Sequence, residues 1–177
     1  MKSHKIALKL YVEGGSLPAH ARFVEVFHDW IKDNVLDETM IDVVDYGHVH
    51  QGPIVLFVGH ESDYAIDLGE GRAGLLYVRK RVSNDDPSSN LDDALKRILA
   101  VAERLEKDPR LVGLAFGRRE VLLRVLDRLR APNVDGTFVE ERAGIEAAFE
   151  RALGKVAVTR EGSDAREPFT VRARVSS

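Results

Sequence analysis

Residues 41–80 read IDVVDYGHVHQGPIVLFVGHESDYAIDLGEGRAGLLYVRK. Four strand-like segments lie within this stretch, at about 41–46, 54–61, 64–68 and 74–80, and turn residues separate them. The links between the segments are too short to hold crossover helices, so neighbouring segments are expected to pair in sequence order. The stretch therefore predicts an antiparallel four-strand meander.

A strand and a helix are predicted before the meander. Residues 5–13 alternate between apolar and polar side chains, which is typical of a half-buried strand. Gly14 and Gly15 end this strand, and Ser16 is expected to be the N-cap of a helix. That helix is indicated by apolar residues at helical spacing, namely Phe23, Val24, Phe27, Trp30 and Ile31.

The segment after the meander is polar. Residues 83–90 read SNDDPSSN, and we expect them to form an internal loop of a single domain spanning 1–177. A boundary here would leave two halves of fewer than about ninety residues each, which is small for separate domains. A helix is expected at 91–107, and Pro109 bars its continuation. Residues 111–116 are expected to form a strand.

The C-terminal third contains one ambiguous stretch. Apolar spacing in 120–130 slightly favours a helix, while Gly117 is equally able to turn the chain into a hairpin strand. Thr137 and Glu140 form a capping-box pattern ahead of a helix that Gly154 closes, and strands at 156–160 and 169–175 follow. The predicted fold class is therefore α+β, with a largely antiparallel sheet, helices packed on one face, and a C-terminal helix followed by two strands.

Composition excludes several classes of protein. The 177 residues are 44% hydrophobic and 31% charged, as in ordinary globular domains. The absence of cysteine excludes disulfides, thiolate metal sites and a cysteine nucleophile. Residues 1–12 hold no uninterrupted apolar core of the kind that a secretory signal needs, and the longest apolar runs, 54–58 and 111–116, are too short to span a membrane. We therefore expect a cytoplasmic protein.

Charge gives no sign of a nucleic-acid or membrane partner. The net charge is −3, and acidic and basic residues are interspersed along most of the chain. Arginines are frequent between residues 118 and 130, but acidic residues dilute them, so a solvated surface is the preferred interpretation. The sequence contains no P-loop, GxGxxG, HExxH, GxSxG or EF-hand motif. No cofactor is indicated.

Two histidines form an HxH pair. His48 and His50 would share one face of an extended strand, as metal ligands can, with His60 or Glu61 as a third ligand. A tight turn at 51–53, however, would place His60 four residues beyond His48 on the partner strand, a separation of about 13 Å at ~3.3 Å per residue. A metal at His48 and His50 therefore requires this segment to fold back as a loop, and exposed positions near a turn are the preferred interpretation.

The same register predicts a polar face on the meander. His60 is expected to face Ala65, with Tyr77 beyond it. One face would then carry Asp42, Tyr46, His60, Asp67, Tyr77 and Arg79. The other face would belong to the core and carry Ile41, Val43, Val55, Phe57, Ile66, Leu68, Leu76 and Val78.

A site on this face would use its side chains in two ways. His60 titrates near neutrality and is the candidate catalytic residue, with Asp42 to orient its ring. Tyr46, Asp67, Tyr77 and Arg79 are the candidate ligand-binding residues. The alternative interpretation is an ordinary solvated sheet face with cross-strand pairs.

Three functions follow from these observations. The first is a ligand-binding or accessory protein that uses the polar face for a small molecule, a protein partner or a homodimer. The second is a small enzyme of hydrolase type, with His60 as general base or a metal on His48 and His50. The third is a structural protein whose exposed strands pair with another subunit.

Overall fold

The computed structural model describes residues 5–14, 16–81 and 87–176. Strands and helices contribute similar shares of this region. The strands are β1 (Ile6–Val12), β2 (Met40–Asp45), β3 (Pro53–Gly59), β4 (Ser62–Asp67), β5 (Gly74–Arg79), β6 (Phe116–Val125), β7 (Val156–Glu161) and β8 (Phe169–Val175). The helices are α1 (His20–Lys32), α2 (Pro87–Lys107) and α3 (Asp135–Leu153), with 3-10 turns η1 (Gly69–Gly71) and η2 (Pro109–Leu111).

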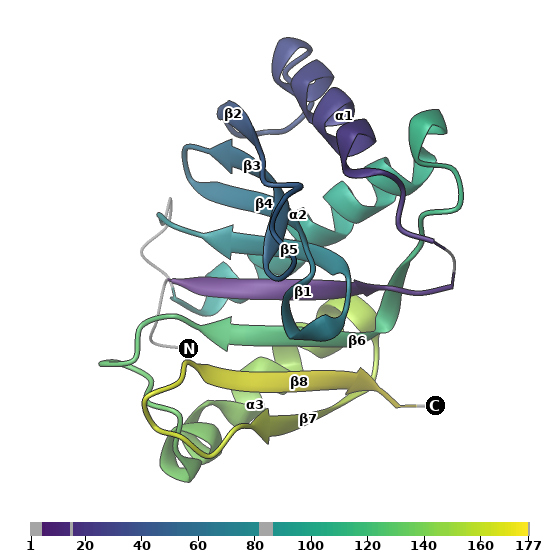
Figure 1. The fold of residues 1–177 in the computed structure, drawn as a ribbon. Coiled ribbons are helices and arrows are strands. Elements are labelled where there is room, and N and C mark those ends of the chain that lie inside the picture. The colour runs from purple at the N-terminus through teal and green to yellow at the C-terminus, as the bar shows by residue number, and fades with distance from the viewer. Residues whose placement is uncertain (1–4, 15, 82–86, 177) are drawn as a thin grey trace.

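All eight of these strands join one sheet (Figure 1), in the order β2-β3-β4-β5-β1-β6-β8-β7. Every neighbouring pair is antiparallel. Strand β1 lies between β5 and β6, so those two strands run parallel to each other and the α2 segment connects them. The predicted α+β class, the antiparallel meander, and the C-terminal helix followed by two strands are confirmed.

The three helices cover one face of the sheet (Figure 1), and the main apolar core lies beneath them. Helix α1 packs on β2 and β3 because its aromatic stripe faces the sheet: Phe27 stacks on Phe57 with ring centroids 4.5 Å apart, and Trp30 meets the same ring edge-on. Helices α2 and α3 contact each other, and α3 also contacts β7. In the part of the chain that the structure describes, no helix is both long and apolar enough to cross a membrane.

No α-helix among the described residues covers the opposite face, yet the centre of that face is buried. Lys9 and Tyr11 point to this side of β1, and each is only 1% exposed. The segment between β4 and β5, which includes η1, crosses in front of β1 (Figure 1). From this segment the Gly69 carbonyl accepts a hydrogen bond from Lys9, and Arg72 lies over the Tyr11 ring. The alternation predicted for this strand is correct, but the strand is buried on both sides rather than half-buried.

Strand β6 corrects two predictions. The sequence slightly favoured a helix at 120–130 and predicted a strand at 111–116. Both predictions are wrong, because the strand runs from Phe116 to Val125. Val121 and Leu122 point to opposite faces of the sheet, and both are buried. A central strand buried on both faces has a continuous apolar run, which short patterns do not distinguish from a helical stripe. Leu129, part of the supposed stripe, is 98% exposed.

Two helix starts also differ from the predictions. Helix α1 begins after Ala19 and α3 begins after Val134, so neither Ser16 nor Thr137 is an N-cap. The prediction of a loop at 83–90 is wrong for residues 87–90, which belong to the first turn of α2. The remainder of that prediction, up to residue 86, lies outside the described residues.

Candidate functional site

The structure divides the predicted polar face between the two sides of the sheet. In the β4–β5 ladder Tyr77 lies opposite Tyr64, not opposite Ala65 as expected. Because strand side chains alternate, a shift of one residue turns the whole of β5 over. Tyr77 and Arg79 are therefore buried on the helix side.

The same shift moves two β5 residues out of the expected core, and a third residue, in β2, leaves it separately. Leu76 and Val78 are only partly buried, on the side of the sheet without helices. Ile41 is 58% exposed, and it adjoins a register irregularity between Met40 and Asp42 in the β2–β3 ladder. The core assignments of Val55, Phe57 and Ile66 are confirmed.

The other candidate residues do not gather around His60. His60 follows β3 in a tight turn, and its Nε2 atom lies 2.9 Å from a guanidinium nitrogen of Arg81. Asp42 pairs with Val58 in the ladder, and its carboxylate accepts the backbone N–H of Val43. Among the described residues, no hydrogen bond or ion pair joins Asp42 to the His60 ring, so the expected catalytic pairing finds no geometric support.

The loop between β2 and β3 carries Tyr46 and both histidines of the HxH pair. The ring centroids of Tyr46 and His48 lie 6.3 Å apart, and His50 is exposed. His20, at the start of α1, lies nearby, with its Nε2 atom 3.5 Å from a carboxylate oxygen of Asp45. Among the described residues, no group of three or more His, Asp or Glu side chains is placed to hold a metal ion.

A buried polar cluster on the helix side contains Tyr77 and Arg79, and one end of it is built around Glu38. The Glu38 side chain is 1% exposed and lies against the β3–β4 turn. Its carboxylate accepts hydrogen bonds from the backbone N–H and the hydroxyl of Ser62 and, at 3.3 Å, from the Tyr64 hydroxyl. Burial raises the pKa of Tyr64, and the nearby Glu38 charge adds to this effect.

The other end of the cluster joins β5 to helix α2. The Arg79 guanidinium donates to the Tyr77 hydroxyl at 3.1 Å, to Asn90 at 3.1 Å, and to Asp93. Arg97 donates to the same Asp93 at 2.8 Å and approaches Glu38 at 3.5 Å. Burial alone would raise the pKa of Asp93, but the hydrogen bonds from the two arginines outweigh it and lower that pKa.

These contacts fix the position of α2 on the meander. Every carboxylate in the cluster faces a guanidinium or a hydrogen-bond donor, as buried charges require. Sequence reasoning missed Glu38, Asp93 and Arg97. Asp93 and Arg97 have an i, i+4 spacing that signals a helical ion pair, but Glu38 contacts Ser62 from 24 residues away without any local pattern.

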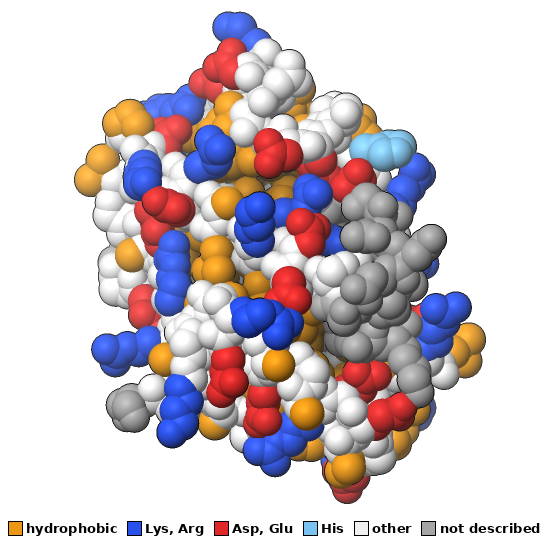
Figure 2. Space-filling model, turned by 180° about the vertical axis from the view of Figure 1, so that it is seen from behind, with side chains coloured by type: hydrophobic (Ala, Val, Ile, Leu, Met, Phe, Trp, Pro, Cys, Tyr) orange, Lys and Arg blue, Asp and Glu red, His pale blue; other side chains and the backbone are white. Residues whose placement is uncertain are grey.

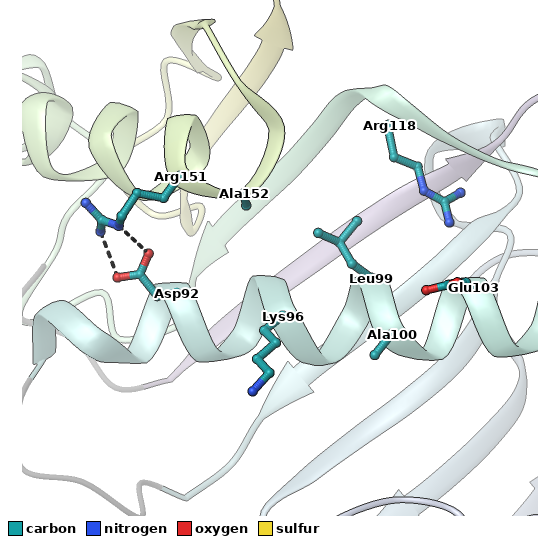
Figure 3. A pocket seen from close by; sticks show the side chains of 8 residues that line it. All are labelled: Asp92, Lys96, Leu99, Ala100, Glu103, Arg118, Arg151 and Ala152. Atoms are coloured by element: carbon teal, nitrogen blue, oxygen red, sulfur yellow. Dashed lines mark hydrogen bonds and ion pairs between the residues drawn. The ribbon is translucent and has the colours of Figure 1, made fainter.

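The outer side of α2 borders a hollow of about 780 Å³ between this helix and the end of α3 (Figure 3). Leu99 points from α2 into the space between the two helices and the start of β6 (Figure 3), and Ala152 lies across from it on α3. At one end the Arg151 guanidinium donates to Asp92 at 2.7 and 2.9 Å. At the other end lies Arg118. The hollow therefore combines an apolar floor with charged ends.

Most of the charged groups around this hollow already have partners. Asp92 pairs with Arg151, Glu103 with Lys107, and Arg118 with Glu106. Lys96 is the exception: within the described part of the chain its ammonium group forms no hydrogen bond or ion pair. The hollow thus has one basic group available for an anion.

Lys96 also borders a second, smaller hollow on the other flank of α2, with a volume of about 110 Å³. Tyr64, Arg97 and Arg104 line it, together with the segment that leads into β2. Lys96 and Ala100 line both spaces and point away from Leu99 in Figure 3. The helix side of the molecule (Figure 2) shows acidic and basic side chains interspersed, with hydrophobic surface between them. The geometry therefore places the candidate site along α2.

No protein-family model and no curated protein matches this sequence.

Proposed function

We propose that this protein binds a small amphipathic anion in the hollow between α2 and α3, with the apolar part of the ligand on Leu99 and Ala152 and the anionic group at Lys96. The proposal keeps the ligand-binding function expected from the sequence. It places the site on α2 instead of on the polar face of the meander.

One observation carries this proposal: the apolar floor shares helix α2 with Lys96, an exposed basic residue that borders the same hollow and has no partner among the described residues. The Lys96 side chain points away from Leu99 (Figure 3), so its ammonium group would meet the anionic group at the edge of the hollow. The volume of about 780 Å³ falls in the range of small-molecule pockets, roughly 300–1,000 Å³. Such pockets combine apolar walls with a few polar groups that orient the ligand. Because the acidic side chains at the hollow are held by arginine or lysine, they repel an incoming anion less than free carboxylates would.

The rigidity of the walls supports the same site. Leu99 and Lys96 lie on one helix, which the Arg79–Asp93–Arg97 contacts hold against the sheet. Sites built on helices hold their geometry better than sites on loops. A ligand would therefore meet a preformed surface and would need to order few additional side chains.

The proposal is tested with two fluorescent probes of the same shape, anilinonaphthalene sulfonate and its uncharged analogue phenylnaphthylamine. Leu99→Glu should weaken binding of both probes by at least about tenfold, which corresponds to about 1.4 kcal/mol. Lys96→Glu should weaken binding of the sulfonate by a similar factor and leave the uncharged probe unaffected.

The matched control is Lys32→Glu, which makes the same charge change at an exposed position at the end of α1. It should bind both probes like the wild type. Near-ultraviolet circular dichroism should show native packing in every variant, because loosely packed states bind the sulfonate non-specifically. Equal affinity of the sulfonate for wild type, Lys96→Glu and Leu99→Glu would refute the proposal.

A further inference from the structure

The sheet face without helices carries a cluster of charged and aromatic side chains around Tyr11. The Tyr11 ring is buried, and the guanidinium carbon of Arg72 lies 3.6 Å from its centroid. The Tyr11 hydroxyl lies 3.1 Å from a guanidinium nitrogen of Arg172 and 3.2 Å from a carboxylate oxygen of Glu70. Arg124 also contacts Glu70. The phenol of Tyr11 and the guanidinium group of Arg124 thus contact the Glu70 carboxylate, and Arg172 reaches the same phenol from beside it.

The other acidic groups of this cluster are held by their own basic partners. Asp67 accepts from the Lys9 ammonium at 2.5 Å. Glu120 accepts from Arg72 at 2.5 Å, from Arg172 at 2.7 Å and from Arg174 at 3.0 Å. Glu161 pairs with Arg172. In total, five basic side chains face four carboxylates: Lys9, Arg72, Arg124, Arg172 and Arg174 face Asp67, Glu70, Glu120 and Glu161.

Glu70 differs from the other three acids in its backbone conformation. It lies at the tip of η1 with φ 64°, a left-handed conformation that is unfavourable by roughly 1 kcal/mol for a residue with a side chain. Its side chain is 34% exposed, more than those of Asp67 and Glu120 and similar to that of Glu161. The Glu70 carboxylate therefore lies at the mouth of the cluster, and rotation of its side chain removes it without unfolding the sheet.

We propose that Glu70 occupies an oxyanion-binding site formed by Tyr11, Arg124 and Arg172, and that a phosphate-bearing small molecule binds there by displacing the Glu70 carboxylate. Arginine and tyrosine donors suit the oxygens of a phosphate. With Glu70 turned outward, five basic groups would face three carboxylates, which leaves an excess of positive charge for the ligand. This site is on the opposite side of the sheet from the α2 hollow and is independent of it.

The test uses inorganic phosphate as the probe at constant ionic strength, and it follows the backbone amide resonances of Gly69 and Gly71 by NMR. Glu70→Gln removes the competing charge and should bind phosphate at least about tenfold more tightly than the wild type. Wild-type resonances should move in the same direction at higher phosphate concentration. Glu70→Gln combined with Arg124→Gln should lose the response.

Two further variants complete the experiment. Glu25→Gln removes a carboxylate that pairs with Arg22 at 3.0 Å on the surface of α1, and it should respond to phosphate like the wild type. Glu70→Gly suits the left-handed backbone better than glutamine does, so it replaces Glu70→Gln if that variant misfolds. The proposal is overturned if removal of the Glu70 charge leaves the phosphate response unchanged, or if the response survives the loss of Arg124.

Discussion

The two faces of the sheet are buried by different chemistry. On one face, helices α1, α2 and α3 cover apolar and aromatic side chains such as Phe27, Phe57 and Leu8. On the other face, a single turn and a set of ion pairs cover Lys9 and Tyr11 to the same degree. The comparison shows that a polar residue in an alternating strand can be as buried as its apolar neighbours when a distant loop brings it a partner.

The two faces also differ in what they leave open. The helix side presents a hollow whose apolar floor and unpaired Lys96 are already accessible. The other side presents a basic cluster in which a carboxylate of the chain itself, Glu70, takes the place of an anion. The first arrangement favours binding without rearrangement, and the second favours binding by displacement.

The largest effect should come from the helix side. Phe27→Ala removes a fully buried ring that stacks on Phe57. It should lower the free energy of unfolding by about 4 kcal/mol, because a cavity is added to the lost burial. Urea unfolding followed by circular dichroism measures this change. A loss below about 1 kcal/mol would show that α1 does not bury its aromatic stripe on the sheet.

The next effect tests burial on the other face. Asp67→Ala leaves the Lys9 ammonium buried without a counter-charge, with the Gly69 carbonyl and the face of the Tyr11 ring as its partners. It should lower the free energy of unfolding by about 3 kcal/mol. Burial already lowers the pKa of Lys9, against the opposing effect of Asp67. The same urea experiment measures the loss.

A double variant distinguishes charge burial from simple loss of packing. Lys9→Met combined with Asp67→Leu removes both charges and keeps apolar volume, so its stability should lie within about 1 kcal/mol of the wild type. If the double variant is no more stable than Asp67→Ala alone, the unpaired charge is not the reason for the loss of stability. That result would contradict the statement that ion pairs bury this face of the sheet.

The smallest effect depends on pH. Burial alone would raise the pKa of Glu120, but hydrogen bonds from Arg72 and Arg174 and the charge of Arg172 outweigh it and lower the pKa to about 2. A carboxylate with a lowered folded-state pKa stabilises the fold above its unfolded-state value of 4.5, and this contribution is lost as pH falls from there toward about 2.

Glu120→Gln should therefore reduce the free energy of unfolding by about 1–2 kcal/mol at pH 7, a range that allows for solvent screening at the half-exposed Arg72 and Arg174. The difference from the wild type should shrink as the pH falls below about 4.5. Urea unfolding at a series of pH values, with Glu25→Gln as the control, measures it. A difference that stays constant with pH would contradict the ionised Glu120 network.

Periodicity was enough to predict the meander, the apolar stripe of the first helix and the final helix with its two strands, because each is encoded locally. The side of the sheet to which each β5 residue points was not encoded in this way. A register shift of one residue between β4 and β5 moved Tyr77 and Arg79 to the helix side. Register in a hairpin depends on the geometry of its connection, and the sequence of the Gly-rich link at 68–73 does not reveal that geometry.

The contacts that bring the residues of both proposed sites together could not be predicted from the sequence. Lys9 forms an ion pair with Asp67, which is 58 residues away in the sequence. Tyr11 accepts a hydrogen bond from Arg172, which is 161 residues away. Leu99 lies on α2 next to the buried residues Leu95 and Ile98, but it is only partly buried, because α3 leaves a hollow over it. These contacts and exposures depend on how distant elements pack, and no local sequence pattern predicts them.

The most direct test of the α2 site is an NMR titration of the wild-type protein with anilinonaphthalene sulfonate, which maps the amides that respond. Our account predicts changes at Lys96, Leu99 and Ala152, with none at Gly69 or Gly71 on the opposite face. Changes confined to the face without helices, with Leu99 and Ala152 unaffected, would contradict it.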